Sequence, residues 1–200
     1  MCHVRNVRYR ILALAAGSSL IVAGCSSSGG GSKDSSGAPS AGGTLTFAAS
    51  ANPACLDPHQ LSEGVSLNVD RQVVDSLTDQ DPDTGKIVPW IATKWEVNAD
   101  STQFTFTLRD DATFSDGTKV DAAAVKANFD DVQALGAKSL LGSTYLAGYT
   151  GSEAPDPTTL IVHFAHPSAQ FLQATATITL GIMSPASLAA SAADRCAGKF

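Results

Sequence analysis

The sequence lacks the short motifs that mark most nucleotide-binding, redox and serine-hydrolase sites. It contains no phosphate-binding Gly-x-x-x-x-Gly-Lys loop, no Gly-x-Gly-x-x-Gly, no Cys-x-x-Cys and no Gly-x-Ser-x-Gly. No part of it resembles a nucleophile with a neighbouring base. These absences favour binding over catalysis, and no cofactor is expected.

Basic residues are also scarce, with 13 lysines and arginines against 19 aspartates and glutamates. Three of the arginines lie in the first ten positions, so the rest of the chain is more acidic than the total net charge of −6 indicates. No basic stripe runs along the sequence. The composition therefore argues against nucleic acid and against an anionic lipid surface as partners.

The chain has only four histidines, and their spacing does not indicate a metal site. His163 and His166 are three residues apart on a predicted strand, where that spacing places two side chains on opposite faces. One metal ion would need both rings on the same side. We interpret them as surface histidines and expect no metal.

Long apolar runs are limited to residues 11–22, which follow three arginines and are too few to span a bilayer as a helix. This is the pattern of a cleaved export signal. The run ends in Val22-Ala23-Gly24-Cys25, which resembles the lipobox of bacterial lipoproteins. We predict a signal peptide over 1–24, lipid on Cys25, and a location on the extracytoplasmic face of the cell membrane. An ordinary signal peptide with a chance cysteine is the alternative.

The next segment, 25–43, contains mostly Ser, Gly, Ala and Pro and has little apolar surface to bury. Such a composition predicts a flexible tether. The folded part is therefore expected to begin near Thr44.

Cysteine is rare, and a role can be predicted for each of the four cysteines. Cys2 leaves with the signal peptide and Cys25 carries the lipid. The remaining pair, Cys55 and Cys196, would lie in an oxidising compartment, which favours a disulfide. Two free buried thiols are the alternative.

The folded region mixes strands and helices, which indicates an α+β or α/β domain. Val65, Val69, Val73 and Leu77 recur every four residues and predict one helix face. Asp121 is a candidate cap for a helix that buries Val125, Phe129 and Val132. Residues 136–151 give no clear pattern. The remaining predictions are strands at 44–48, 94–97, 103–108 and 158–164, and a short helix at 167–174.

Several segments, taken in order, resemble the family 5 extracellular solute-binding proteins, which are the peptide-type receptors of ABC transporters. The matching segments are LDPH at 56–59, PWIATKW at 89–95, FTFTLR at 104–109, FSDGT at 114–118, AAAVKANF at 122–129, PDPTTL at 155–160 and IMSP at 182–185. The resemblance implies a hinged α/β protein of the periplasmic-binding-protein-like type II class, peptide-binding subclass. Such a protein closes on a peptide or similar small solute and delivers it to an ABC permease with its ATPase subunits.

Members of this family continue for several hundred residues, whereas nothing follows Phe200 here. The sequence is therefore expected to be an N-terminal piece of a receptor that is monomeric at full length. By this resemblance 44–57 holds the first strand of lobe one, 58–190 a small satellite α+β subdomain, and 191–200 a return segment.

The resemblance also suggests where a solute would bind. Glu63-Gly64-Val65 is similar to a segment that faces the bound peptide in oligopeptide-binding members, and His59 is a candidate polar lining residue. A carboxylate at Glu63 suits a peptide amino group. The alternative is a glutamate that only favours a helix N-terminus. The runner-up function is a secreted enzyme or a non-transport adhesion lipoprotein on a similar scaffold.

Overall fold

The computed structural model describes residues 42, 44 and 46–199. The chain divides into two compact units, 1–45 and 46–200, and the second is the one described below. The predicted signal peptide, Cys25 and nearly all of the predicted tether lie outside the described residues. The described part contains no helix with the length and hydropathy of a bilayer-crossing segment.

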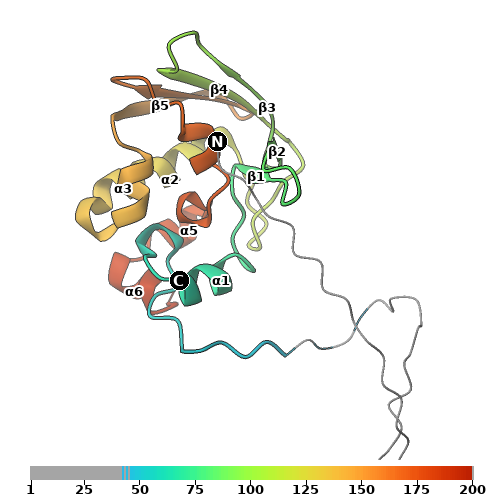
Figure 1. Ribbon diagram of the computed structural model, residues 1–200, viewed down its shortest axis with the longest axis vertical. Coiled ribbons are helices and arrows are strands. Elements are labelled where there is room, and N and C mark those ends of the chain that lie inside the picture. The colour runs from blue at the N-terminus through green and yellow to red at the C-terminus, as the bar shows by residue number, and fades with distance from the viewer. Residues whose placement is uncertain (1–41, 43, 45, 200) are drawn as a thin grey trace, which may run out of the picture. The chain divides into compact units, whose positions relative to one another are not determined.

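An antiparallel four-stranded sheet forms one end of the unit (Figure 1). Its strands are β3 (Ala92–Val97), β4 (Gln103–Leu108), β5 (Tyr149–Asp156) and β6 (Thr159–Phe164), in the order β3-β4-β6-β5. The strand predicted at 103–108 is confirmed, and along it Phe104, Phe106 and Leu108 are buried while the residues between them are half-buried. Successive side chains of a strand point to opposite faces, so this pattern turns one face of the sheet inward.

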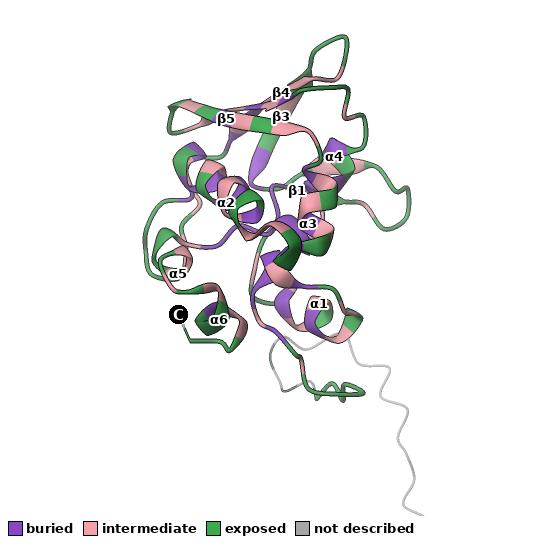
Figure 2. Cartoon of the chain, turned by 90° about the vertical axis from the view of Figure 1, so that its left-hand side faces the viewer, coloured by how far each residue is buried: buried purple, intermediate pink, exposed green. Residues whose placement is uncertain are grey.

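Helix α2 (Ala122–Leu135) covers that inner face, together with the short α4 (Phe171–Ala174). The predicted cap is confirmed, since the Asp121 carboxylate accepts a hydrogen bond of 2.8 Å from the backbone N–H of Ala124. The predicted core face of α2 is also confirmed, because Val125, Phe129 and Val132 are fully buried. Figure 2 shows buried residues gathered on these strands and helices and exposed residues at the hairpin tips.

Short helices form the opposite end of the unit, around a second small core of Cys55, Leu61 and Ile178. The segments there are η1 (Pro58–Gln60), α1 (Gly64–Asp70), η3 (Ile178–Leu180), α5 (Pro185–Leu188) and α6 (Ala192–Cys196). The remaining elements are the hairpin of β1 (Thr78–Gln80) and β2 (Ile87–Pro89), and η2 (Gly136–Lys138) with α3 (Leu140–Tyr145) in the segment that the sequence left unassigned.

Two predicted elements are wrong. The valine-faced helix over 65–77 ends at Asp70, and its buried residues are Ser66 and Asp70 rather than the valines. Val73 is 76% exposed. The strand predicted at 44–48 is not formed over its described residues either, because 46–48 forms no ladder with any described strand and Phe47 is 79% exposed. A strand needs a neighbour to pair its backbone groups, and an apolar sequence cannot supply one alone.

Candidate functional site

The predicted solute-recognition residues Glu63, Gly64 and Val65 lie together at the start of α1. The Glu63 carboxylate Oε1 accepts hydrogen bonds from the Ser66 hydroxyl at 2.6 Å and from the Ala54 backbone N–H at 3.0 Å. These bonds, that of Ser66 first, lower the pKa of Glu63 and keep the group ionised at neutral pH. Its Oε2 has no hydrogen-bond partner among the described residues, and Gly64 is exposed. The structure therefore presents one oriented negative charge at this surface.

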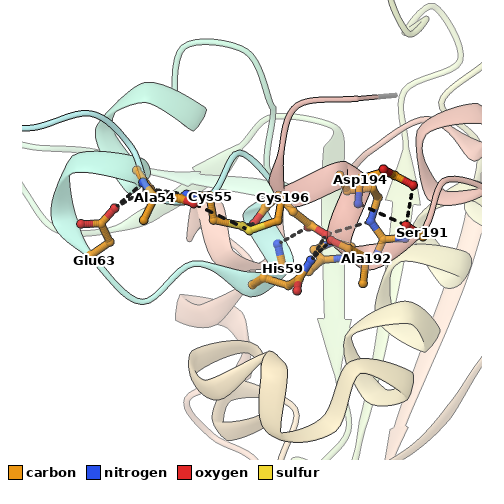
Figure 3. Close-up of a disulfide and its surroundings, with 12 residues drawn as sticks. Ala54, Cys55, His59, Glu63, Ser191, Ala192, Asp194 and Cys196 are labelled. Carbon is orange, nitrogen blue, oxygen red and sulfur yellow. Dashed lines mark hydrogen bonds and ion pairs between the residues drawn. A yellow bond between two sulfur atoms is a disulfide. The ribbon is translucent and has the colours of Figure 1, made fainter.

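A disulfide anchors the extended segment that contains Ala54. The structure joins Cys55 to Cys196 with their Cα atoms 4.3 Å apart, as the pairing of the two remaining cysteines predicted. The Leu56 N–H also donates to the Cys196 carbonyl at 3.0 Å. Figure 3 shows Glu63 and Ala54 on one side of this bond and His59 on the other. The backbone donor that orients Glu63 is thus adjacent to a covalent link.

His59 is not placed with the other three predicted residues. Its side chain is fully buried, and its backbone N–H donates to the Asp57 carboxylate at 2.9 Å. Asp57 caps η1 in this way, and the turn directs the imidazole into the interior. Both ring nitrogens have protein partners, which are Asp131 at 2.7 Å and the Gly181 carbonyl at 2.9 Å. Within the described chain His59 therefore has a structural position rather than one that lines a solute surface.

Sequence reasoning missed the charged cluster around this histidine. The buried Arg195 guanidinium donates from Nε to Asp57 at 2.8 Å and from one terminal nitrogen to both oxygens of Asp131 at 3.1 and 2.9 Å. Its other terminal nitrogen donates to the carbonyls of Leu188 and Ala190. No local pattern marks these partners, because Asp131 and Arg195 are 64 residues apart. The only sequence signal was the LDPH segment at 56–59, which contains Asp57 and His59.

Burial and charge oppose one another in the pKa values of this cluster. Burial alone would raise the pKa of Asp131, but the hydrogen bond and charge of His59 and the charge of Arg195 together lower it. Burial likewise disfavours the charged form of Arg195, and its bonds to Asp57 and Asp131 outweigh that and raise its pKa. Both groups therefore remain ionised at neutral pH.

A groove of about 490 Å³ lies elsewhere on the unit. Its walls are mainly apolar, and the polar groups of Asp75 and Arg109 are among its lining residues. Arg109 is paired with Asp111 through a bond of 2.6 Å, and Asp75 accepts a bond from the Trp90 indole. The segment 63–65 does not line this groove, so the two surfaces are separate. Among the described residues there is also no group of three His, Cys, Asp or Glu side chains arranged to hold a metal ion.

Comparison with known proteins identifies the relatives of this chain. Residues 86–195, more than half of the sequence, match the family model "Bacterial extracellular solute-binding proteins, family 5 Middle". The chain is 30% identical over 161 residues to the probable D,D-dipeptide-binding periplasmic protein DdpA of Escherichia coli K12, which covers 77% of this chain and 30% of DdpA.

Solved structures agree with this match. The murein tripeptide binding protein MppA of Escherichia coli superposes with a TM-score of 0.65 at 27% identity, over 74% of this chain and 32% of MppA. Haemophilus influenzae OppA, solved in complex with RPPGFSPFR, gives a TM-score of 0.65 at 26% identity, over 75% of this chain and 32% of OppA. The chain thus spans about a third of the length of these relatives.

The order of motifs and the structure lead to the same family. MppA and OppA have the type II periplasmic-binding-protein fold, and the mixed α/β unit described above matches part of it. The predicted fold class is therefore confirmed, and both family and fold are those of solute-binding proteins rather than enzymes. The chain belongs to the bacterial extracellular solute-binding proteins of family 5.

Proposed function

We propose that the protein is an extracytoplasmic receptor that binds peptides or similar small solutes and delivers them to an ABC import permease with its ATPase subunits. The observation that carries the proposal is the family match over residues 86–195. Relatives named for D,D-dipeptide, glutathione and murein peptide binding support the peptide-like solute class. Lipid on Cys25 would hold the receptor at the membrane, and the full-length receptor would act as a monomer.

Glu63 is the group we propose for solute recognition on this chain. Two hydrogen bonds fix one oxygen of its carboxylate, and the other oxygen faces no described partner. A charge-assisted bond from a peptide amino group suits such an oxygen, because the carboxylate is already ionised and oriented. Gly64 adds no side chain that would block approach, and Val65 offers a small apolar contact. His59 contributes indirectly, through the bonds that join its turn to Asp57 and to the Gly181 carbonyl.

Binding to this chain alone should be weak. Small-molecule sites enclose most of the ligand in a concavity, and the chain spans only about a third of its relatives' length. One wall of a site can supply the charged group, but without enclosure its hydrogen bonds to the ligand stay exposed to water and are weaker. We therefore expect millimolar rather than micromolar affinity for free peptides.

Amide chemical-shift mapping tests this proposal because it detects millimolar binding. The chain is titrated with di- to pentapeptides and with the same peptides acetylated at the amino terminus. Shifts at Gly64 and Val65 are expected with free peptides and should be reduced at least about fivefold by acetylation or by Glu63→Gln. Asp83→Asn, in an exposed turn, is the matched control and should change nothing. Shifts confined to other surfaces, or equal shifts with acetylated peptides, would contradict the role of Glu63.

A further inference from the structure

The hydrogen bonds of His59 require more protons than a neutral imidazole carries. Nδ1 lies 2.7 Å from Oδ2 of Asp131, and Nε2 lies 2.9 Å from the carbonyl oxygen of Gly181. A neutral imidazole has one N–H and one acceptor nitrogen, whereas the imidazolium ion has two N–H groups. The Gly181 carbonyl can only accept, so Nε2 must donate.

The other partner is also an acceptor. Asp131 accepts two hydrogen bonds from the Arg195 guanidinium in addition to the contact with His59. A guanidinium has donors only, so both Asp131 oxygens serve as acceptors. Protonation of either oxygen would weaken a charge-assisted hydrogen bond from Arg195 and is therefore unfavourable. Nδ1 of His59 must therefore donate as well, and the ring is cationic.

The cluster is electrically balanced only in that state. Its members are the carboxylates of Asp57 and Asp131, the guanidinium of Arg195 and the imidazole of His59. With a cationic ring the two negative and two positive charges cancel. With a neutral ring one negative charge remains uncompensated in a site where the His59, Asp57 and Arg195 side chains are at most 3% exposed and that of Asp131 is 20% exposed. An unpaired buried charge is strongly destabilising.

We propose that doubly protonated His59 is the pH-sensitive member of a latch that fastens α6 to η1 and α2. Charged and polar groups reach it from several elements: Asp57 precedes η1, Asp131 lies on α2, Arg195 lies on α6, and the Gly181 carbonyl follows η3. Helix α3 also packs against η1 but carries no charged residue. From α1 the buried Asp70 lies near enough for the charge of Asp57 to contribute, after burial, to its raised pKa. Loss of the ring proton removes one donor and leaves the cluster negative, so α6 loosens as the pH rises.

Proton linkage determines whether the closed state becomes more or less stable as the pH rises. A group that is protonated in the folded state and releases its proton on opening stabilises the closed state at lower pH and loses that contribution as the pH rises. The Cys55–Cys196 bond still holds the last residue of α6. The opening is therefore local and would be detected at the amides of α6 rather than as global unfolding.

The test uses the whole oxidised chain with ¹⁵N-labelled histidine. At pH 7 we expect both ring nitrogens of His59 to show the chemical shifts of protonated imidazolium. His163, a half-buried histidine paired with Glu153 on the sheet, is the internal reference for a ring partly in contact with solvent. A single unprotonated nitrogen in His59 at pH 7 would overturn the proposal, and this readout needs no variant that might fail to fold.

A second measurement tests the latch itself. The helical amides of Arg195 and Ala197 should lose protection from hydrogen exchange by about tenfold or more between pH 6 and pH 8.5, after correction for intrinsic exchange, as expected for loss of a charged hydrogen bond. His163→Gln should leave this change intact, whereas His59→Gln should give low protection at both pH values. Protection that stays constant with pH in the wild type would overturn the latch.

Discussion

At the scale of single residues, Asp70 is the least satisfied group in the described structure. It ends α1, is 1% exposed, and neither of its carboxylate oxygens has a hydrogen-bond partner among the described residues. Burial, followed by the negative charge of Asp57, raises its pKa to about 6. An acid whose pKa is raised by folding stabilises the protein less as the pH rises from its unfolded value toward the folded one, and the full penalty applies above pH 6.

Replacing this carboxylate with a neutral group should therefore stabilise the protein at neutral pH. Asp70→Asn is expected to raise the free energy of unfolding at pH 7.5 by up to ~3 kcal/mol, the upper limit set by the size of the shift. The gain should shrink as the pH falls toward 4, where Asp70 is protonated. Urea denaturation at pH 4.5, 6 and 7.5 measures it. Asp83→Asn, at an exposed turn, should show no such trend, and a gain independent of pH would point to packing instead.

At the scale of elements, the sequence predicted β4 and α2 because their buried residues are apolar and recur at the regular spacing of a strand or a helix. The alternation over Gln103–Leu108 and the spacing of Val125, Phe129 and Val132 each place apolar groups on one face. The same reasoning failed for α1. There the buried positions belong to Ser66 and Asp70, and Ser66 contacts the distant Cys55 backbone. Polar residues such as Ser66 can be buried when residues elsewhere in the chain form hydrogen bonds with them. The spacing of residues within one segment does not indicate those distant partners.

The residues of the candidate site also fall into two groups, those that the sequence indicated and those that it did not. Cysteine count alone led to the Cys55–Cys196 pair, and the family resemblance led to the carboxylate of Glu63. The cluster of Asp131 and Arg195 had no local signal, since two surface-type residues far apart in sequence reveal a shared interior only once the chain is folded.

The cap of α2 offers a direct test at this scale. Asp121→Ala removes the acceptor for the Ala124 N–H, so the free energy of unfolding should fall by about 1 kcal/mol. Asp121→Asn keeps an acceptor and should lose much less. Chemical denaturation of both variants checks the prediction, and equal losses would show that the charge of Asp121 matters rather than its capping bond.

At the scale of the whole molecule, the disulfide closes a loop with a sequence separation of 141 residues. The chain-entropy model gives up to ~5 kcal/mol for a loop of this length, and residual structure in the unfolded chain reduces it. The double variant Cys55→Ser/Cys196→Ser should therefore unfold at lower denaturant than the oxidised protein. Reductant should lower the wild type to the same midpoint and leave the variant unchanged. A wild type that is indifferent to reductant would rule out a stabilising disulfide.

The membrane attachment proposed for Cys25 is tested in cells, since that residue lies outside the described structure. A diacylglycerol thioether with a further acyl chain offers many buried CH₂ groups, at ~0.8 kcal/mol each, which suffices for stable anchoring. Cys25→Ser should shift the protein from the membrane to the soluble extracytoplasmic fraction. If the variant stays in the membrane fraction like the wild type, the lipobox interpretation is wrong.

The bond between Cys55 and Cys196 also determines how the unit would respond to a pulling force. The bond links an early and a late segment of the described unit, and there Leu56 and Cys196 are also joined through their backbones. Tension applied to the segments before Cys55 and after Cys196 would therefore load a covalent bond and bypass the sheet and its helices. Roughly 480 Å of contour length lies behind that bond. It becomes extensible only after reduction, so an oxidised unit would act under load as a short, stiff link in the polypeptide.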